Sequence, residues 1–355
     1  MRIAQVAPLY ESVPPQRYGG TERVVSYITE ELVDRGHEVT LFAAGDSVTR
    51  ARLVSPCKHS LRTDEQSVDS LAPHVTMLNQ VFKESHNYDI IHFHIDYLHF
   101  PVSMRTEVPN VTTLHGRLDI PELEPLYREF SSMRVVSISD AQRQPLPWLN
   151  WQGTVHHGLP QDLYAFSKEP GTYLAFLGRI SPEKGVDRAI EIAVRAGMKL
   201  KIAAKVDPVD QDYFNRRIKP LLDNPLVDFI GEVSELEKND FLGKARALLL
   251  PVDWPEPFGL VMIEAMACGT PTVAFRRGAV PEIIDEGVSG FVCTGVDDSI
   301  AALSCLGAVS RKRCRQAFEE RFTVARMIND YVDLYEQVIE EAGEFREERS
   351  MAGRS

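Results

Sequence analysis

Residues 247–271 read ALLLPVDWPEPFGLVMIEAMACGTP, and this stretch decides the predicted fold. Its apolar start, residues 247–250, predicts a buried strand, and residues 258–267 have the length and composition of a helix. We expect Pro257 at the first helical position and Gly269 just past the last one. The free N–H groups at the start of this helix would attract an anion at the carboxyl end of a sheet strand.

Two carboxylates belong to this expected helix, with Glu256 just before it and Glu264 about two turns inside it. Glu264 lies six residues after the expected helix start at residue 258, and at about 1.5 Å of rise per residue this separates the two carboxylates by roughly 9 Å along the helix axis. Carboxylates accept hydrogen bonds well, so the pair would hold different ends of one long ligand. A retaining hydrolase needs its two carboxyl groups about 5 Å apart, so this pair would be too far apart for that reaction. The alternative is that Glu264 is a solvated helix residue and Glu256 a helix cap.

Short apolar runs alternate with amphipathic segments of helical length on both sides of this stretch. The expected strands are residues 3–7, 39–43, 90–93, 111–114 and 135–138, then 174–177, 200–203, 227–230, 247–250 and 272–274. This alternation is typical of parallel sheets wrapped by helices. A chain of 355 residues is also too long for one ordinary domain. We therefore expect an α/β protein with two Rossmann-like, doubly wound domains facing a central cleft, joined within residues 158–171.

The composition argues against several classes of protein. Hydrophobic residues make up 44% of the chain, but no apolar run reaches the roughly 18 residues of a membrane span. The five cysteines form no CxxC pair, and the first apolar segment is too short for a signal peptide, so we expect a cytoplasmic protein with reduced thiols. The net charge of −12 argues against a nucleic-acid partner, although a few local cations could still bind a phosphorylated ligand.

A second motif, FLGRISPEKG at residues 176–185, places cations near an expected helix start. We expect a strand to run into a loop that carries Gly178, Arg179 and Lys184, and a helix to begin near Val186. Two cations beside a helix N-terminus suit a diphosphate and would stabilise it as a leaving group. The alternative is a surface arginine and lysine around a turn.

A third motif, YGGTER at residues 18–23, lies between the first expected strand and the first expected helix. Gly19 and Gly20 would let the backbone approach a ligand closely. Their spacing differs from the dinucleotide pattern G-x-G-x-x-G, so a dehydrogenase loses its main support. A plain turn is the alternative.

All ten histidines lie at or before His157, so any catalytic histidine comes from the first half of the chain. His115 is the better site candidate, because it begins a loop after an expected strand. His92, His94 and Asp96 alternate along one segment and could bind a metal ion. Buried, hydrogen-bonded histidines are commoner, however, and we expect no metal site.

Together these motifs resemble the retaining nucleotide-sugar glycosyltransferases of the GT-B fold, specifically glycosyltransferase family 4. The resemblance covers nearly the full chain, and the E-x7-E element from Glu256 to Glu264 is its most specific part. The AVPE sequence at residues 279–282, followed by Gly287 and Gly290, also matches. The resemblance implies an acceptor-side domain at residues 1–165 and a donor domain at 166–322. Residues 323–355 would form a helix that crosses back onto the first domain and frays at its charged end.

The resemblance also implies a role for each matching residue. Glu256 would hold hydroxyls of the donor sugar, Glu264 would bind the ribose, and His115 would contact the sugar near the reacting carbon. Arg179 and Lys184 would neutralise the diphosphate, so neither a divalent metal nor another cofactor is implied. The expected catalytic residues are His115, Glu256, Arg179 and Lys184. The remaining donor contacts would come from Gly19, Gly20, Gly178, Phe258, Gly259 and Leu260.

The chain departs from the family pattern at AAKVD, residues 203–207, where such enzymes commonly carry a glycine after the strand. Lys205 could add positive charge near the nucleotide. The AAKVD and VDWPEPFG segments look like a subgroup that includes small-molecule glucosyltransferases, among them pterin glucosyltransferases. UDP-glucose is therefore the favoured donor, and transfer of a hexose with retention is the expected reaction.

The acceptor stays open as a small molecule or a saccharide, and so does the oligomeric state. The first domain lacks a strongly basic amphipathic helix, which disfavours a membrane lipid as acceptor and leaves at most a peripheral membrane contact. Two alternatives are a nucleotide-sugar epimerase on the same fold and a noncatalytic protein that binds nucleotide sugars or glycans. The expected acceptor-side residues are Tyr18, His94, Asp96, Arg117 and Asp140, of which Asp140 could instead cap a helix.

Overall fold

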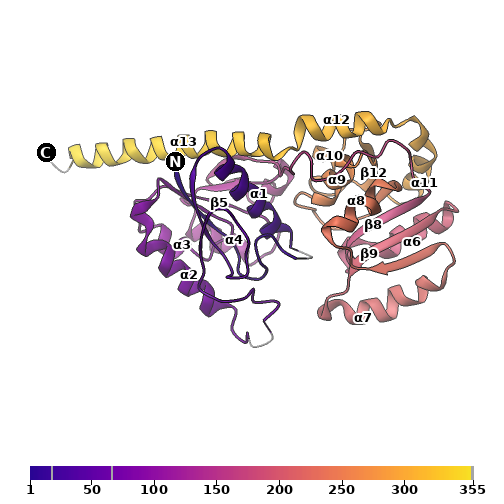
Figure 1. Cartoon of the computed structure of the whole chain (residues 1–355), viewed down its shortest axis with the longest axis horizontal. Coiled ribbons are helices and arrows are strands. Elements are labelled where there is room, and N and C mark those ends of the chain that lie inside the picture. Colours follow the sequence, from indigo (N-terminus) through magenta and orange to yellow (C-terminus); the bar gives the residue numbers. More distant parts are fainter. Residues whose placement is uncertain (17–18, 65–66, 353–355) are drawn as a thin grey trace. The chain divides into compact units, whose positions relative to one another are not determined.

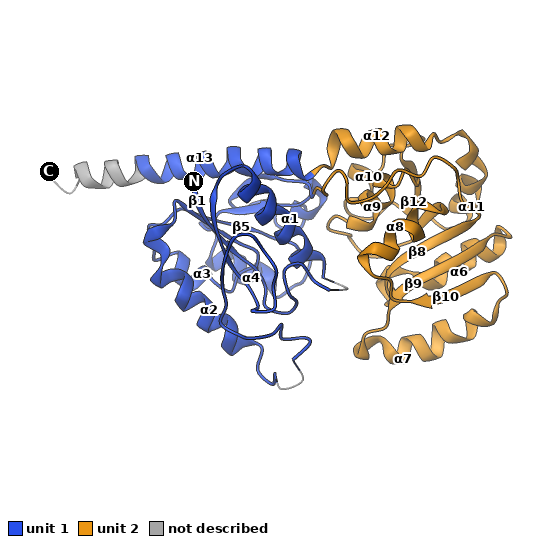
Figure 2. Ribbon diagram, in the orientation of Figure 1, with its two compact units in different colours: residues 1–157, 324–355 blue, residues 158–323 orange. Residues whose placement is uncertain are grey.

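The computed structural model describes residues 1–16, 19–64 and 67–352, and each of its two compact units contains a parallel sheet flanked by helices (Figure 1). Unit 1 comprises Met1–His157 together with the chain from Val324 onward, and unit 2 comprises Gly158–Thr323 (Figure 2). The chain thus leaves unit 1 at residue 157, some residues before the expected boundary between 165 and 166.

Within the described residues, unit 1 is built on a seven-stranded sheet with the order β3-β2-β1-β4-β5-β6-β7. Neighbouring strands are parallel, and the chain moves from β1 first to one edge and then to the other, as in doubly wound folds. The strands are β1 (Arg2–Val6), β2 (Glu38–Phe42), β3 (Arg52–Val54), β4 (Ile90–Phe93), β5 (Asn110–Thr113), β6 (Val135–Ser137) and β7 (Trp151–Thr154).

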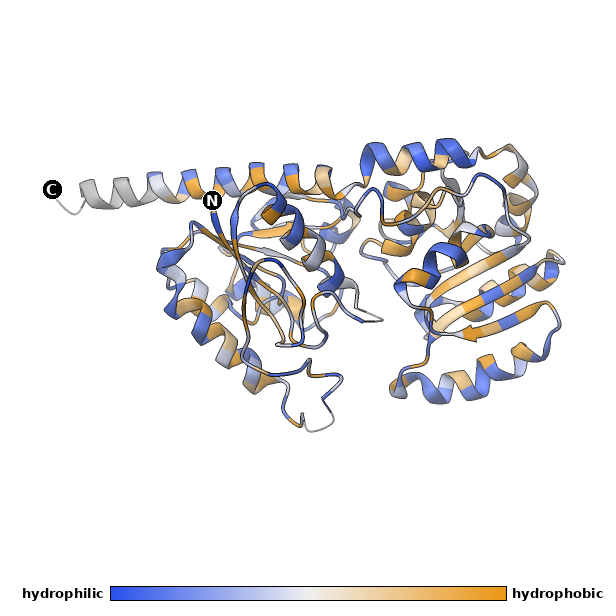
Figure 3. Ribbon diagram, in the orientation of Figure 1, coloured by the Kyte–Doolittle hydropathy of each residue, from blue (hydrophilic) through white to orange (hydrophobic). Residues whose placement is uncertain are grey.

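The helices of unit 1 include the C-terminal helix α13, which contacts α1. Arg35, the residue directly after α1, donates from Nη1 to Oδ1 of Asn329 at 2.6 Å and from Nη2 to the carbonyl of Ala325 at 2.8 Å. Hydrophobic and hydrophilic residues alternate along α2 and α13, as expected for helices with one face on a sheet (Figure 3). The helices are α1 (Gly20–Asp34), α2 (Leu71–Lys83), α3 (Phe100–Ser103), α4 (Leu123–Glu129), α5 (Asp140–Arg143) and α13 (Val324–Ala352).

Unit 2 has a six-stranded parallel sheet among its described residues, with the order β10-β9-β8-β11-β12-β13. The strands are β8 (Tyr173–Arg179), β9 (Lys199–Lys205), β10 (Val227–Gly231), β11 (Ala245–Leu250), β12 (Thr272–Phe275) and β13 (Gly290–Cys293). The helices are α6 (Val186–Arg195), α7 (Gln211–Tyr213), α8 (Glu235–Gly243), α9 (Leu260–Ala267), α10 (Val280–Ile283), α11 (Val296–Cys305) and α12 (Arg311–Arg321).

The two doubly wound sheets confirm the expected fold class, and every expected strand is present within two residues at either end. The sequence did not predict β3, β7 and β13. All three lie at sheet edges. An edge strand has backbone N–H and C=O groups that are unpaired on one side, and long apolar runs are avoided there. The sequence of β7, WQGT, illustrates this, because it offers no such run.

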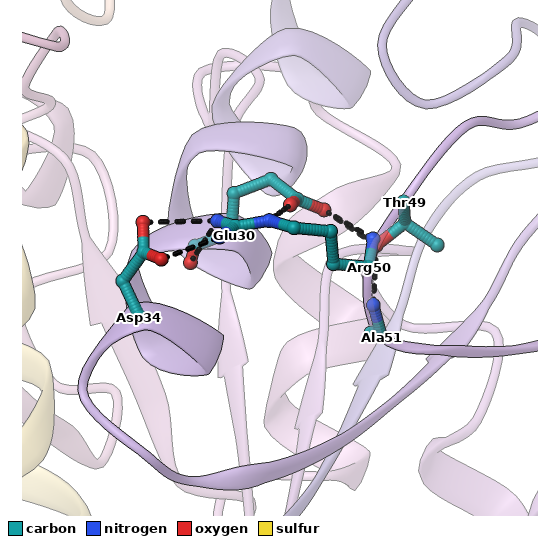
Figure 4. A network of polar contacts seen from close by, with 5 residues as sticks. All are labelled: Glu30, Asp34, Thr49, Arg50 and Ala51. Atoms are coloured by element: carbon teal, nitrogen blue, oxygen red, sulfur yellow. Dashed lines mark hydrogen bonds and ion pairs between the residues drawn. The ribbon is translucent and has the colours of Figure 1, made fainter.

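A polar network ties α1 to the loop that precedes β3 (Figure 4). Arg50 donates from Nε to Oε2 of Glu30 at 2.7 Å and from Nη2 to Oδ2 of Asp34 at 2.9 Å. Because Glu30 and Asp34 are four residues apart, they share one face of the helix, and a single guanidinium reaches both. The hydroxyl of Thr49 donates to Glu30 at 2.6 Å and accepts the N–H of Ala51 at 3.0 Å.

A buried arginine holds several loops of unit 2 together. Arg311 begins α12 and is 7% exposed, and its guanidinium meets backbone carbonyls rather than a carboxylate. Burial lowers the pKa of this guanidinium. Its partners are the carbonyls of Ser167 at 2.7 Å, Gly243 at 2.9 Å, Ala245 at 2.9 Å and Cys268 at 3.4 Å, and the hydroxyl of Thr270 at 2.7 Å. The planar fork of donors in arginine suits this arrangement, and an ammonium group cannot reproduce it.

We predict that Arg311→Lys destabilises unit 2 by about 2–4 kcal/mol, because several buried carbonyls lose their donors. Urea unfolding of the purified variant measures this loss. Arg313→Lys on the exposed face of the same helix is the matched control and should change the stability by less than about 0.5 kcal/mol. Equal midpoints for the two variants would show that Arg311 does not hold these loops.

Candidate functional site

Two cations end neighbouring strands of the sheet in unit 2. In the register of β8 and β9, Gly178 pairs with Ala204 and Arg179 pairs with Lys205. The prediction that Gly178 and Arg179 lie in a loop was wrong, because β8 continues past its apolar run to Arg179. Arg179 and Lys205 therefore lie at the carboxyl edge of the sheet, where doubly wound folds bind ligands.

Three carboxylates surround these two cations. Arg179 donates from Nη2 to Oε1 of Glu183 at 2.7 Å, and its Nη1 lies 3.7 Å from Oδ2 of Asp207. Its Nε lies 3.9 Å from Oδ2 of Asp210. Lys205 places Nζ 2.8 Å from Oδ1 of Asp207. The cluster is thus neutralised by acidic side chains, and an anionic ligand would compete with them for the two cations.

Lys184 forms an ion pair with Glu256, 72 residues further along the chain. Its Nζ lies 2.6 Å from Oε2 of Glu256, and the indole Nε1 of Trp254 donates to the same oxygen at 2.9 Å. The ammonium also lies 4.7 Å from the centre of the Trp254 ring, a cation–π contact. Glu256 is 6% exposed, and its second oxygen, Oε1, makes no hydrogen bond within the described residues.

Backbone contacts explain why Lys184 reaches Glu256. Strands β8 and β11 are neighbours in the sheet, so the loops that follow them leave the same edge side by side. The N–H of Asp253 donates to the carbonyl of Glu183 at 2.8 Å. Gly185 adopts a left-handed φ of 71°, and a Cβ there would lie 2.2 Å from the carbonyl oxygen of Pro251. Glycine at this position therefore allows the two loops to touch.

A third loop fixes the backbone of Glu256. The N–H of Ala279 donates to the carbonyl of Glu256 at 2.8 Å. Gly278 has a φ of 53°, and a Cβ there would lie 2.2 Å from the carbonyl oxygen of Glu256 and 2.4 Å from its nitrogen. Sequence reasoning singled out AVPE at residues 279–282 but missed Gly278, although the glycine directly before that motif was a usable signal.

Helix α9 begins at Leu260, three residues after the expected start at Pro257, so that prediction was wrong. Gly259, with a φ of 84°, precedes the helix in the left-handed conformation. The left-handed backbone of Gly259 interrupts helical geometry before Leu260, and the side chain of Phe258 is buried and meets Phe322 edge-on with the ring centres 6.2 Å apart. The estimate of roughly 9 Å between the two glutamates assumed helical rise from residue 258 onward, and that assumption fails because the helix begins at Leu260.

The C-terminal end of α9 behaves as expected. Gly269 has a φ of 78°, its N–H donates to the carbonyl of Met266 at 2.8 Å, and the N–H of Thr270 donates to that of Ala265 at 2.8 Å. These bonds satisfy carbonyls that the helix end leaves open.

Glu264 is a buried residue, so its interpretation as a solvated helix position was wrong. It is 4% exposed, and its Oε1 lies 2.9 Å from Nζ of Lys238 in α8. Its Oε2 makes no hydrogen bond among the described residues. The start of α9 has no side-chain cap, so Glu256 is not a cap either. Sequence reasoning missed Lys238, because a lysine between Glu235 and Asp240 in a polar helix looks solvated.

In unit 1, His115 follows β5 and is half-buried. Its Nε2 lies 2.9 Å from Nδ1 of His94, and its ring stacks on that of His157 with the ring centres 5.3 Å apart. Burial lowers the pKa of His115 to about 3, so the imidazole is neutral at neutral pH.

The rings of His92 and His94 are occupied by hydrogen bonds to other side chains. His92 contacts Tyr335 and Thr113, and His94 contacts Gln5 and His115. Among the described residues, no group of three or more histidine, cysteine, aspartate or glutamate side chains is arranged to hold a metal ion. This part of the chain therefore uses its histidines in a hydrogen-bond network.

The other expected acceptor-side residues that the structure describes are Asp96, Arg117 and Asp140. Within the described residues, Asp96 is the one non-glycine residue with a left-handed φ, at 49°, and it is exposed. Arg117 forms two bonds of 2.6 Å with Asp119. Asp140 begins α5 and accepts the hydroxyl of Thr154 at 2.6 Å, while the capping role belongs to Ser139. Tyr18 lies outside the described residues.

The early glycines belong to the start of α1. Gly20 is its first residue and Gly19 precedes it. A Cβ on Gly19 would lie 2.8 Å from Cβ of Pro15, so the backbone approaches that proline closely.

None of the helices in the described part of the chain combines the length and apolar character that crossing a membrane requires.

Two family models match the chain. Residues 165–308 match the model described as Glycosyl transferases group 1, and residues 18–150 match that described as Glycosyltransferase Family 4. The N-acetyl-alpha-D-glucosaminyl L-malate synthase of Bacillus anthracis is 26% identical over 372 residues, which cover 90% of this chain and 94% of that protein. The glycogen synthase of Mycobacterium tuberculosis is 25% identical over 378 residues, with 89% of each chain covered.

Solved structures share the fold. Sucrose-phosphate synthase from Thermosynechococcus elongatus superposes with a TM-score of 0.76 at 18% identity, covering 96% of this chain and 99% of that one. Anabaena Alr3699/HepE in complex with UDP and glucose gives a TM-score of 0.74 at 18% identity, covering 95% of this chain and all of that one. These likenesses show that the two Rossmann-like units form the GT-B fold.

We predict that Gly278→Ala lowers turnover of a nucleotide-sugar donor about 100-fold, because the added Cβ displaces the backbone of Glu256. Steady-state kinetics measure the effect. Gly287→Ala is the matched control, since Gly287 has a similar φ of 70° but open space around its Cβ position. Both variants bear the left-handed backbone cost of about 1–2 kcal/mol. Equal turnover in both would mean that the position of Glu256 is unimportant.

Proposed function

The chain belongs to glycosyltransferase family 4, and from this premise we propose that it transfers a hexose, with glucose favoured, from a UDP-sugar to an acceptor with retention of configuration. Glycosyltransferase activity with a nucleotide-sugar donor follows from the family itself. The hexose, the nucleotide and the stereochemistry are our proposal, and the geometry of unit 2 is its main support.

The observation that carries the proposal is the shared arrangement of Glu256 and Glu264. Each is almost fully buried and directs one oxygen to a lysine, Lys184 or Lys238. The other oxygen of each carboxylate has no hydrogen-bond partner in the described part of the chain. Carboxylate oxygens are strong acceptors for hydroxyl donors. We propose that Oε1 of Glu256 accepts a hexose hydroxyl and that Oε2 of Glu264 accepts a ribose hydroxyl.

The diphosphate would bind to the cations at the carboxyl edge of the sheet. Arg179 and Lys205 are already close together and paired with carboxylates, so a diphosphate would replace Asp207 or Glu183 as their partner. The negative charge on the departing diphosphate grows as the glycosidic bond breaks, and fixed cations stabilise that charge. Lys184 would contribute from the Glu256 side. These cations would supply the charge that a divalent metal supplies in other enzymes.

The named relatives support the donor and leave the acceptor open. Anabaena Alr3699/HepE has been solved with UDP and with UDP-glucose, which supports UDP-glucose for this chain. The relatives include an N-acetyl-alpha-D-glucosaminyl L-malate synthase, a glycogen synthase and a D-inositol 3-phosphate glycosyltransferase, so their names point to different acceptors. We propose a small-molecule or saccharide acceptor.

We also propose a cytoplasmic location, which is supported by the five cysteines, all of them free thiols.

We predict that, among a panel of nucleotide sugars without acceptor, UDP-glucose is hydrolysed fastest and releases UDP and α-glucose. Proton NMR in the first minutes of the reaction measures the anomer before it equilibrates. The α-anomer is expected because the donor carries an α-linkage and the reaction retains it. Lys184→Met should abolish this turnover, which shows that it arises from the proposed site.

Each competing function gives a different result in the same assay. An epimerase would convert the sugar while it stays attached to the nucleotide. A binding protein would show ligand shifts without turnover of any nucleotide sugar. Initial release of β-glucose would contradict retention, and faster turnover of another nucleotide sugar would contradict UDP-glucose as the donor.

A further inference from the structure

A chain of hydrogen bonds runs through the interior of unit 1 from His115 toward the C-terminal helix α13. Nε2 of His115 lies 2.9 Å from Nδ1 of His94, and Nε2 of His94 lies 2.9 Å from Oε1 of Gln5. The amide nitrogen of Gln5 then donates to the hydroxyl of Tyr335 at 3.1 Å. Gln5 and Tyr335 lie 330 positions apart in the sequence and are in direct contact, so consecutive hydrogen bonds link His115 to α13.

Beyond Tyr335 the chain of hydrogen bonds continues to a second tyrosine of α13. The hydroxyl of Tyr335 lies 2.6 Å from Nδ1 of His92, and Nε2 of His92 lies 2.7 Å from the hydroxyl of Thr113. That hydroxyl lies 2.9 Å from the hydroxyl of Tyr331. Each of these side chains is buried. Since a buried polar group without a partner costs about 1–3 kcal/mol, the protons must be arranged so that every contact joins one donor to one acceptor.

Gln5 determines the direction in which the hydrogen bonds of this series are donated. An amide nitrogen can only donate and an amide oxygen can only accept. Because Gln5 donates to Tyr335, its oxygen must accept from His94, which therefore carries its proton on Nε2. Burial holds the pKa of His94 well below its usual value, so this ring carries a single proton and its Nδ1 is an acceptor. The contact between His94 and His115 then requires the proton of His115 to be on Nε2.

The same direction continues on the other side of Gln5. The hydroxyl of Tyr335 accepts from Gln5 and donates to Nδ1 of His92, so His92 carries its proton on Nε2 and donates to Thr113. Gln5 and Tyr335 therefore control the tautomers of both histidines. Tyr331 lies beyond His92, at the far end of the chain, and does not affect the direction that Gln5 sets.

We propose that this hydrogen-bond chain fixes the tautomer of His115 and leaves its Nδ1 as an acceptor for a substrate hydroxyl, with Gln5, His94 and Tyr335 as positioning residues. The inference rests on the proposed function, since it identifies what His115 does toward a sugar. Nδ1 makes no hydrogen bond within the described residues. A neutral ring with a lone pair at this position selects groups that donate, such as sugar hydroxyls, over phosphate oxygens and carbonyls.

The remaining contacts of His115 hold the ring in one orientation. His157 stacks against one face, with 18° between the ring planes. One face and one nitrogen of His115 are thus fixed, and Nδ1 is the polar ring atom left for a ligand.

Nitrogen-15 NMR of the full-length protein with labelled histidines tests the tautomer directly, with His115→Gln used to assign the signal. We predict that His115 shows a protonated Nε2 and an Nδ1 of lone-pair type at neutral pH. A protonated Nδ1 would overturn the inference, because the chain would then run in the opposite direction. This readout does not depend on activity, so it remains decisive if no nucleotide sugar is turned over and the proposed function fails.

A pair of variants on α13 tests the positioning role. Tyr335→Phe removes the hydroxyl that accepts from Gln5, so we predict a mixture of His115 tautomers and a roughly tenfold loss of kcat for UDP-glucose. Binding of UDP, which lacks the hexose, should be unchanged. Tyr331→Phe makes the same chemical change at an equally buried position outside the directed part of the chain, and should keep the single tautomer. Identical tautomers and kcat in the two variants would contradict the role of Tyr335.

Discussion

The ion pair between Nζ of Lys184 and Oε2 of Glu256, at 2.6 Å, is the interaction on which the proposed donor site depends. It joins the loops that follow two neighbouring strands, β8 and β11. Removing such a pair from water is costly, and the geometry must be good for the attraction to offset that cost. Here a second donor, Nε1 of Trp254, shares the carboxylate oxygen. The backbone around the pair is built to keep the two loops in contact.

Glycine makes this geometry possible at two positions. Gly185 and Gly278 both adopt left-handed φ values, and at both a Cβ would lie within 2.2 Å of a carbonyl oxygen. Gly185 allows the Lys184 loop to approach Pro251, and Gly278 allows a third loop to support Glu256. Glu256 is therefore placed by loops, whereas Glu264 is placed by a regular helix and by Lys238 in α8. The two carboxylates reach similar burial by different structural means.

The central strands and the carboxyl-edge motifs could be predicted from the sequence, because buried parallel strands leave long apolar runs and loop motifs follow them directly. The edge strands β3, β7 and β13 could not, since one neighbour and partial exposure do not require such runs. The start of α9 was wrong because Pro257 satisfies a local rule, while the burial of Phe258 depends on the distant Phe322. At the start of α9, tertiary packing therefore overrides the local sequence pattern.

The partners of the candidate site residues were the least predictable part. Lys238 has no local signal, and only the fold shows that it meets Glu264. Gln5 reads as one more residue of a buried first strand, yet it bonds to Tyr335 at the other end of the chain. His115 could be singled out by its place after a strand, but its neutral state and its hydrogen bond to His94 come from burial and from long-range contacts.

The most direct test of the proposed donor site is Glu256→Gln, which keeps the shape of the side chain and removes its charge. Donor turnover and calorimetric UDP binding are measured on the variant and on Glu264→Gln as the comparison. We predict that Glu256→Gln loses turnover by about 100-fold while UDP binding is largely kept, and that Glu264→Gln weakens UDP binding. Wild-type turnover in Glu256→Gln would contradict the assignment of Glu256 to the donor sugar.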